Sequence, residues 1–343
     1  MSRIFVDLHH STLYKSLQML FEDRLGFSLF RPIGKDWFEQ GYWKLAEPYG
    51  NNPSTVEQYL GLRDYQPVDG SKPLNQIEEV KPDYYLINDP FKPHKAITLG
   101  QFKEMEFDII IASYDRHIEP FKKLLQFQPK AKFVFQIGND WKVDFTQVKN
   151  LMASVAPYDV PKGVNAVFYH QEVDTSLFNY KPHQGAEIGR SFVNCLSTAD
   201  IFKQDWLDFQ ELERQLHYKL ESFGGGCRDG IVQHQEDVAR MMKESMFGIH
   251  LKSGGDGFGH VLFNWFACGR PVICRKSQYK CKLADKLLTD ETCFDLDKGM
   301  DYVVKRVNAM SDSMHQIVYN KFKAEVDFDK DAEAIKSFIE KLI

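Results

Sequence analysis

Apolar positions in the first part of the chain follow the spacing of a strand and then of a helix. Ile4–Leu8 is a short apolar run typical of a buried strand, and a polar loop follows it. The next segment repeats apolar residues at the spacing of one helix face and ends before Gly26; these residues are Leu13, Leu17, Leu20, Phe21 and Leu25. The pattern therefore predicts a strand, a loop and a helix, which is the opening of an α/β fold.

The same alternation continues through the first half of the chain. Strand patterns lie at Phe27–Phe30, Tyr84–Ile87, Asp108–Ala112, Lys132–Ile137 and Asn165–Tyr169, and a helix pattern covers Ile118–Phe127. Residues 31–75 are aromatic and rich in turn residues without a sustained period, so we expect an insertion with short helices there. Strands that alternate with helices predict a parallel sheet.

A polar stretch, Asn179–Gly189, interrupts this pattern and is the best candidate for a linker. Strand and helix patterns then resume, with strands at Ser191–Leu196, Lys219–Phe223 and Phe247–Leu251 and helices at Asp205–Leu216, Gln235–Lys243 and His260–Cys268. A chain of 343 residues suits two such domains. We expect Rossmann-like domains over 1–178 and 179–325, and a C-terminal helix over 326–343 that could return to the first domain.

Composition narrows the class of protein. The chain is 43% hydrophobic and 27% charged, as in globular proteins, and no window approaches the ~20 apolar residues of a membrane span. The N-terminal MSRIFVDLHH lacks the features of a signal peptide, which favours a cytoplasmic location. A net charge of −5 argues against non-specific coating of nucleic acid but leaves a local basic groove open. The six cysteines form no CxxC pair and are expected to be free structural thiols.

The segment GGDGFGH, residues 254–260, lies between a predicted strand and a predicted apolar helix. Ligands bind at the carboxyl ends of parallel strands, and glycines there allow the backbone to approach a ligand closely. Asp256 could accept hydrogen bonds from a polyol, and Asn264 lies two turns along the same side of the helix. Alternatively, the glycines only form a turn, with Asp256 capping the helix and Asn264 bonded to backbone.

Residues 256–273, DGFGHVLFNWFACGRPVI, resemble the nucleotide-sugar signature of retaining GT-B glycosyltransferases of the family 4 type. The resemblance covers roughly residues 165–275, including EVDTSLF at 172–178, which is similar to the crossover between the two domains of that family. It implies a GT-B fold, with two Rossmann-like domains whose parallel sheets face a central cleft. It also implies a UDP- or GDP-linked sugar donor, no cofactor and no metal.

The resemblance assigns roles to residues of the second domain. Asp256 would be catalytic and would hold the donor sugar together with the backbone of Gly257, Phe258 and Gly259. Asn264 would replace the acid that binds the ribose, with Ser197 also on the nucleotide. The family's Arg and Lys after the first strand of this domain are missing at 194–197. The diphosphate still needs cations, and the candidates are Arg228, Lys252 and Lys203. Each could instead be a solvated surface charge.

Loops after the strands of the first domain carry the candidates for binding the acceptor. His9 and His10 follow the first strand, Asp115 and His117 follow Asp108–Ala112, and Asp140 follows Lys132–Ile137. Histidine titrates near neutral pH and aspartate can orient a hydroxyl or act as a base, so His10 and Asp115 are catalytic candidates. A retaining enzyme would need no such base. The alternative is that these residues cap the following helices or are exposed.

The aromatic insertion leaves the acceptor open. Its side chains could stack on sugars or on flipped bases beside Arg31, Lys35 and Lys44, or they could pack the insertion itself; they are Trp37, Phe38, Tyr42, Trp43, Tyr49 and Tyr59. The leading hypothesis is a glycosyltransferase whose acceptor is a glycan, a lipid-linked glycan or a modified DNA base. The alternatives are a phage-type enzyme for hydroxymethylated DNA, and a sugar-nucleotide-binding protein without turnover.

Overall fold

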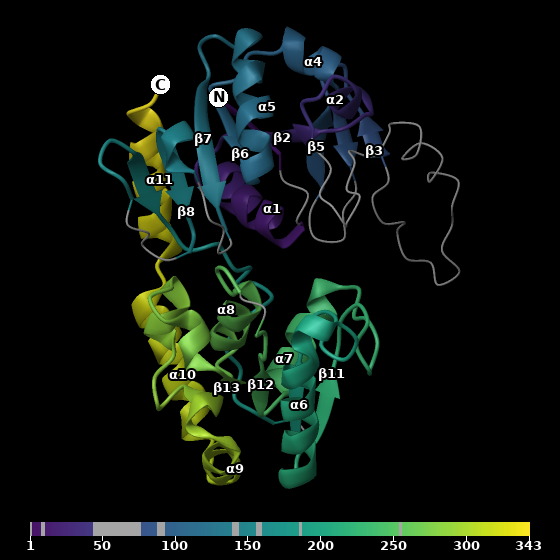
Figure 1. Ribbon diagram of the computed structural model, residues 1–343, viewed down its shortest axis with the longest axis vertical. Coiled ribbons are helices and arrows are strands. Elements are labelled where there is room, and N and C mark those ends of the chain that lie inside the picture. The colour runs from purple at the N-terminus through teal and green to yellow at the C-terminus, as the bar shows by residue number, and fades with distance from the viewer. Residues whose placement is uncertain are drawn as a thin grey trace. The chain divides into compact units, whose positions relative to one another are not determined.

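The computed structural model describes residues 2–7, 11–43, 77–87, 93–138, 144–155, 160–184, 187–253 and 256–343. The chain divides into two compact α/β units (Figure 1). The first contains the described residues of Met1–Ser154, Asp159–Glu172 and Asp329–Ile343, and the second those of Val155–Tyr158 and Val173–Phe328. The division after Glu172 precedes the polar stretch 179–189, whose last two residues lie in a strand of the second unit.

The described residues of the first unit form a nine-stranded sheet in the order β3-β4-β5-β2-β1-β6-β7-β8-β9. The strands are β1 (Arg3–Val6), β2 (Ser28–Pro32), β3 (Ile77–Val80), β4 (Tyr85–Ile87), β5 (His94–Ile97), β6 (Ile109–Ala112), β7 (Lys132–Ile137), β8 (Asn150–Ala153) and β9 (Asn165–Phe168). Strand β4 is antiparallel to β3 and β5, and all other pairs are parallel. The sheet is therefore parallel except at one edge.

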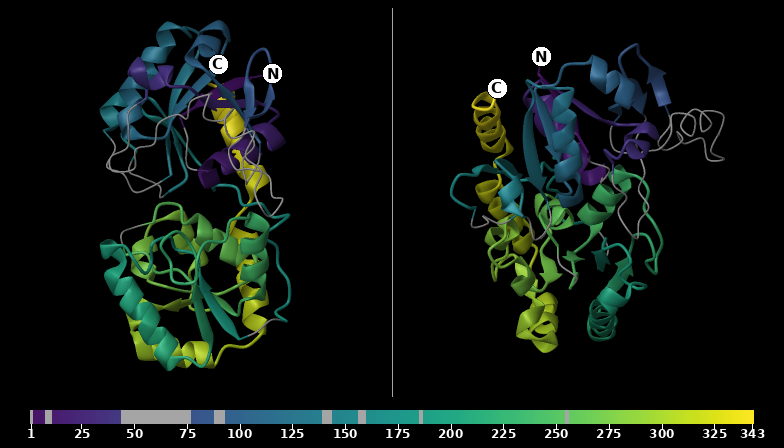
Figure 2. Two further views of the ribbon diagram at one scale, coloured as in Figure 1. Left: turned by 90° about the vertical axis from the view of Figure 1, so that its right-hand side faces the viewer. Right: turned by 45° about the horizontal axis from the view of Figure 1, so that its top comes forward.

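Helices of the first unit are α1 (Ser11–Gln18), which continues into a π-helical turn, α2 (Asp36–Glu39), α4 (Leu99–Glu104), α5 (Ile118–Lys123) and α11 (Phe328–Glu340). The C-terminal helix α11, yellow in Figure 2, packs its apolar face, including Ile335 and Ile339, on the core formed by α1 and β1. Two contacts hold its start: Asp331 accepts from His170 Nδ1 at 2.9 Å, and Asp329 pairs with Arg24. The end of the chain thus belongs to the first unit.

The described residues of the second unit form a five-stranded parallel sheet in the order β11-β10-β12-β13-β14. The strands are β10 (Ile188–Ser191), β11 (Lys219–Ser222), β12 (Phe247–Ile249), β13 (Val272–Cys274) and β14 (Cys293–Asp295). The helices are α6 (Lys203–Gln215), α7 (Gln235–Glu244), α8 (His260–Ala267), α9 (Met300–Asn308) and α10 (Ser313–Glu325). Right-handed crossovers place α6 on one face and α7 and α8 on the other, because β11 and β12 lie on opposite sides of β10.

None of the helices in the described part of the chain combines the length and apolar character needed to cross a bilayer.

The first strand of the second unit differs from its prediction. We predicted Ser191–Leu196, whereas β10 is Ile188–Ser191 and the residues after it form a loop. Gly189 looked like part of a linker, but it is needed inside the strand because a Cβ there would lie 2.3 Å from the ring of Phe247. The apolar residues Val193 and Leu196, which suggested a strand, belong to the core from within the loop.

The Gly-Arg-Pro after α8 is structural. Gly269 has φ +70°, and a Cβ there would lie 2.4 Å from the ring of Tyr180. The Arg270 guanidinium is buried and donates to the main-chain oxygens of Lys181 and Cys268 at 3.1 and 3.0 Å. These contacts fix the end of α8 against the segment that leads into β10.

Candidate functional site

Two loops at the carboxyl edge of the second sheet are tied together by hydrogen bonds. Cys195 N donates to Gly225 O at 2.7 Å, and Gly225 N donates to Asn194 Oδ1 at 3.1 Å. The Ser197 hydroxyl donates to Gly226 O at 2.9 Å. Ser197, predicted to bind the nucleotide, therefore joins the loop after β10 to the loop after β11.

Asp256 lies at the centre of a polar cluster in the loop after β12. Its Oδ2 accepts from His250 Nε2 at 2.8 Å and from the Tyr279 hydroxyl at 3.3 Å, and its Oδ1 accepts from Lys252 Nζ at 2.9 Å. The main-chain oxygen of Asp256 accepts from Lys282 Nζ at 2.6 Å. Burial alone would raise the pKa of Asp256, but His250 and Lys252 outweigh it and hold the pKa well below its usual range. Asp256 is therefore a carboxylate at neutral pH.

A second acid anchors the loop that carries Asp256. Asp205 is fully buried on α6, and its carboxylate accepts from both the backbone N–H and the hydroxyl of Ser253 at 2.6 Å. Sequence reasoning missed this residue. The sequence did contain an indication: Asp205 lies at helical spacing from Phe209 and Leu212, on the face of α6 that is buried.

The start of α8 excludes the capping alternative for Asp256. The N-cap is Gly259, with φ +79° in the left-handed region, and no side chain caps the helix. Phe258 stacks on Phe263 with ring centres 4.1 Å apart, so its side chain is part of the core. Only the backbone of the Gly-Phe-Gly segment, beside the positive end of α8, is then suited to bind a ligand.

Asn264 has an unsatisfied polar atom inside the apolar helix. The residue is 5% exposed, and its Oδ1 has no hydrogen-bond partner among the described residues. His250 Nδ1 is likewise buried without a partner in the described part of the chain. A buried acceptor without a donor is unfavourable by about 1–3 kcal/mol, which a ligand hydroxyl could relieve.

Arg228, predicted to bind the diphosphate, is held by two acids of its own unit. It contacts Glu213 at 2.9 Å and Asp229 at 3.2 Å, donates to the main-chain oxygen of Leu220 and lies 5.6 Å from the ring centre of Phe209. This arrangement argues against Arg228 as a phosphate ligand, because a phosphate would have to displace two carboxylates. Lys203, also predicted for this role, is exposed at the start of α6.

The carboxyl edge of the first sheet holds a buried acid that sequence reasoning did not single out. Asp7, at the end of β1, accepts from Ser113 N at 2.8 Å, Tyr114 N at 3.3 Å and His117 Nδ1 at 2.7 Å. His117 is 1% exposed, and its ring stacks on Phe121 with centres 5.4 Å apart. Its burial argues against the prediction that His117 faces an acceptor.

The other acceptor-side candidates are exposed or lie outside the described residues. Asp115 is exposed, and its Oδ1 accepts from the backbone of Arg116 at 2.7 Å. His9, His10 and Asp140 lie outside the described residues.

The predicted aromatic insertion is described only in part. Lys44, Tyr49 and Tyr59 lie outside the described residues. Trp37 is buried, stacks on Phe5 with ring centres 4.9 Å apart and donates from Nε1 to Ile97 O at 3.0 Å. Trp43 is also buried, whereas Phe38 is 39% exposed. Both tryptophans therefore pack in the unit rather than present a stacking surface.

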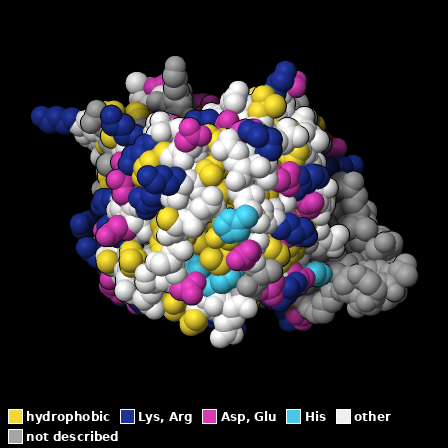
Figure 3. Space-filling model, turned by 90° about the horizontal axis from the view of Figure 1, so that it is seen from below, with side chains coloured by type: hydrophobic (Ala, Val, Ile, Leu, Met, Phe, Trp, Pro, Cys, Tyr) yellow, Lys and Arg dark blue, Asp and Glu magenta, His cyan; other side chains and the backbone are white. Residues whose placement is uncertain are grey.

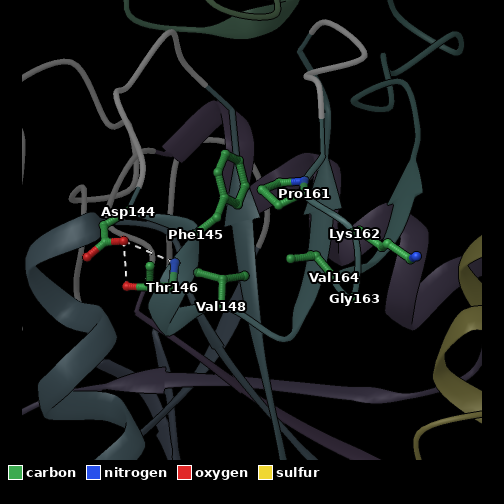
Figure 4. A pocket seen from close by; sticks show the side chains of 8 residues that line it. All are labelled: Asp144, Phe145, Thr146, Val148, Pro161, Lys162, Gly163 and Val164. Atoms are coloured by element: carbon green, nitrogen blue, oxygen red, sulfur yellow. Dashed lines mark hydrogen bonds between the residues drawn. The ribbon is translucent and has the colours of Figure 1, made fainter.

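A pocket of about 390 Å³ opens in the first unit, lined by residues within 144–148 and 161–164 (Figure 4). These residues precede β8 and β9, so the pocket lies at the amino edge of the parallel strands. Its polar lining includes Asp144, which accepts from Thr146 N at 3.0 Å. Ligands of α/β folds bind at the carboxyl edge, so this pocket is not the candidate site.

No group of His, Cys, Asp and Glu that could hold a metal ion occurs among the described residues. All six cysteines are free thiols; Cys268, Cys274 and Cys293 are buried in the core, whereas Cys281 is exposed. The Sγ atoms of Cys274 and Cys293 lie 3.4 Å apart in the core, a distance longer than a disulfide bond.

Solved structures of glycosyltransferases resemble this chain over its whole length. HepE from Anabaena, in complex with UDP, has a TM-score of 0.63 at 10% identity, covering 99% of this chain and 100% of that one. The pneumococcal O-GlcNAc transferase GtfA, in complex with UDP and GlcNAc, has a TM-score of 0.60 at 10% identity, covering 100% and 99%. A DNA-modifying β-glucosyltransferase has a TM-score of 0.51 at 10% identity, covering 98% and 99%.

Comparison of the sequence with protein-family models and with curated proteins finds no match. The structural neighbours nevertheless define the class of fold, because the alignments span both units. The chain has the GT-B fold, and the fold class predicted from its sequence is confirmed. At 10% identity the likeness extends to the fold alone, so the activity has to be argued from the residues of the site.

Proposed function

We propose that this chain is a glycosyltransferase that moves a sugar from a nucleotide diphosphate donor to a hydroxyl acceptor. The observation that carries the proposal is the Asp256 cluster at the carboxyl edge of the second sheet, directly before the glycine-capped start of α8. The cluster combines a permanent carboxylate, lysines and a helix N-terminus, which suits a sugar bound through a diphosphate.

The neighbours support the choice of donor. HepE has been solved with UDP and with UDP-glucose, and GtfA with UDP and GlcNAc. We propose that the donor of this chain is likewise a UDP- or GDP-linked sugar and that Asn264 Oδ1 accepts a hydrogen bond from the nucleotide ribose. Retention of the anomeric configuration follows from the resemblance of residues 256–273 to retaining enzymes and belongs to the same proposal.

Donor hydrolysis tests this function without knowledge of the acceptor. The protein is incubated with UDP-glucose, UDP-GlcNAc or GDP-mannose, and the release of free sugar and nucleoside diphosphate is measured. Thermal shift with the same compounds identifies the nucleotide, because a ligand raises the melting temperature by mass action. Slow release of sugar from one donor supports an enzyme, whereas neither binding nor release from any nucleotide sugar contradicts the proposal.

A binding protein without turnover is the second candidate. It is favoured by the loop after β10, where residues 194–197 contain no cation, and by Arg228, whose guanidinium is paired with Glu213 and Asp229. Such a protein would bind a nucleotide sugar tightly without releasing the sugar in the presence of any acceptor tested. Product analysis by NMR separates the two candidates and also reports the anomeric configuration.

A DNA acceptor is the third candidate, and it is favoured by the fold similarity to the DNA-modifying β-glucosyltransferase. On the face drawn in Figure 3, however, lysines and arginines alternate with acidic side chains and form no continuous basic surface among the residues described there. Binding of DNA to a phosphate-tracking groove should weaken steeply with salt. Absence of DNA binding at low salt would remove this candidate.

A further inference from the structure

The side chains around Asp256 leave its carboxylate little capacity to bind a sugar. His250, Lys252 and Tyr279 all donate to it, at 2.8, 2.9 and 3.3 Å. A carboxylate has about four acceptor positions, and hydrogen bonds from charged donors are roughly twice as strong as neutral ones. Three of these positions are filled, two on Oδ2 and one on Oδ1, so only one remains for a further donor, and the arrangement fits an acid that holds cations in place.

Lys282 joins this cluster from a segment distant in sequence. It follows β13, and its Nζ donates to Asp256 O at 2.6 Å and lies 5.9 Å from the centre of the Tyr279 ring. Tyr279 is fully buried and bonded to Asp256 Oδ2. The stem of Lys282 is therefore guided by a fixed aromatic ring, while the residue as a whole is only half-buried.

Two lysines and one carboxylate meet in the described part of the cluster. Asp256 contributes one negative charge, and Lys252 and Lys282 contribute one positive charge each. The Lys252 side chain is 34% exposed, so it can reach a ligand without leaving its partner. The positive end of α8 begins three residues after Asp256, at the N-cap Gly259.

We propose that Lys252 and Lys282 form the cationic clamp for the donor diphosphate, and that Asp256 is a positioning residue that holds the two lysines rather than a ligand of the sugar. This inference rests on the proposed function and deepens it. It supplies the cations that the loop after β10 lacks, from the loops after β12 and β13 instead. Charge that develops on a leaving diphosphate is stabilised by cations already in place.

The test compares the binding of UDP and uridine to the whole protein by isothermal titration calorimetry. Lys282→Met and Lys252→Met keep most of the aliphatic stem but remove the charge. Each should weaken UDP binding about tenfold, as for loss of one charge-assisted hydrogen bond, and leave uridine binding unchanged. The matched control is Lys280→Met, an exposed lysine two residues from Lys282, which should leave both affinities unchanged.

The positioning role of Asp256 has its own readout. Asp256→Asn should weaken UDP binding in the wild-type background but have no further effect in a Lys252→Met, Lys282→Met double variant, because Asp256 acts through those lysines. Melting curves of each variant verify folding. UDP affinity of Lys282→Met within twofold of the wild type would overturn the clamp and leave the proposed function standing. Failure of the wild type to bind UDP or GDP and to release sugar would overturn both.

Discussion

Each unit places a carboxylate next to a buried histidine at the carboxyl edge of its sheet, but the surroundings differ. Asp7 is fully buried, and backbone N–H groups of Ser113 and Tyr114 share it with His117. Asp256 has a 12% exposed side chain and shares its charge with His250 and with half-buried lysines. A contact between Asp and His is therefore not by itself the mark of a catalytic site. Asp7 fixes a loop, whereas Asp256 holds two half-buried lysines, which are the cations of the proposed clamp.

The largest effect is expected from Asp7→Ala. It leaves His117 and two backbone N–H groups without their buried acceptor, so the free energy of unfolding should fall by about 3–5 kcal/mol. Urea denaturation followed by tryptophan fluorescence measures this. The control is Asp115→Ala, an exposed acid on the same edge, which should change stability by less than about 0.5 kcal/mol. Equal stability of the two variants would contradict the structural role of Asp7.

Asp256→Ala should, in contrast to Asp7→Ala, reduce activity more than stability. Removal of the carboxylate releases Lys252 and Lys282 from their positions, so sugar transfer or donor hydrolysis should fall about 100-fold or more. The protein should still fold, with some loss of stability because the buried His250 and Tyr279 lose an acceptor, whereas the half-buried lysines can turn to water. Initial rates and melting curves of one preparation test both statements. Near-wild-type turnover would remove Asp256 from the site and end the contrast with Asp7.

Asn264→Leu should produce a smaller and different change. Leucine is similar in size and removes the buried Oδ1 that lacks a partner among the described residues, so stability should stay the same or rise. Loss of the proposed ribose contact should weaken the binding of UDP and the binding of uridine by the same factor, about tenfold. Lys282→Met, in contrast, should spare uridine. Unchanged uridine affinity would show that Asn264 does not contact the ribose.

The smallest effect concerns acid stability. Burial and the nearby Arg270 charge lower the pKa of His315 to about 4, against the donor contact of its Nε2 with Met246 O at 2.9 Å. The unfolded chain therefore binds more protons than the folded one between about pH 6.5 and 4, and stability falls as the pH falls through this range. From pH 7 to about 5.7 the wild type should lose about 1 kcal/mol more than His315→Gln, whose amide can still donate to Met246 O. Parallel pH curves in urea would contradict this.

Much of the architecture followed from local pattern. The alternation of strands and helices, the strand Lys132–Ile137 and the loop around Asp256 were predicted, because apolar periodicity and glycine spacing are local properties of the chain. Short strands were harder to predict from the sequence. The strands β3, β5, β8, β13 and β14 were not predicted, since three or four residues carry too little pattern to stand out from loops.

For the candidate site, too, local sequence indicated some features and tertiary structure decided the others. Sequence alone indicated the GT-B class and the Asp256 loop, because both depend on residue types at close spacing. Tertiary structure alone decided which side chains meet there. Lys282 and Asp256 are 26 residues apart, Ser253 and Asp205 are 48 apart, and Ser113 and Asp7 are 106 apart. Such partners are brought together by the order of strands in a sheet, which no local pattern records. The tertiary structure likewise pairs Arg228 with Glu213 and places Lys282 beside Asp256.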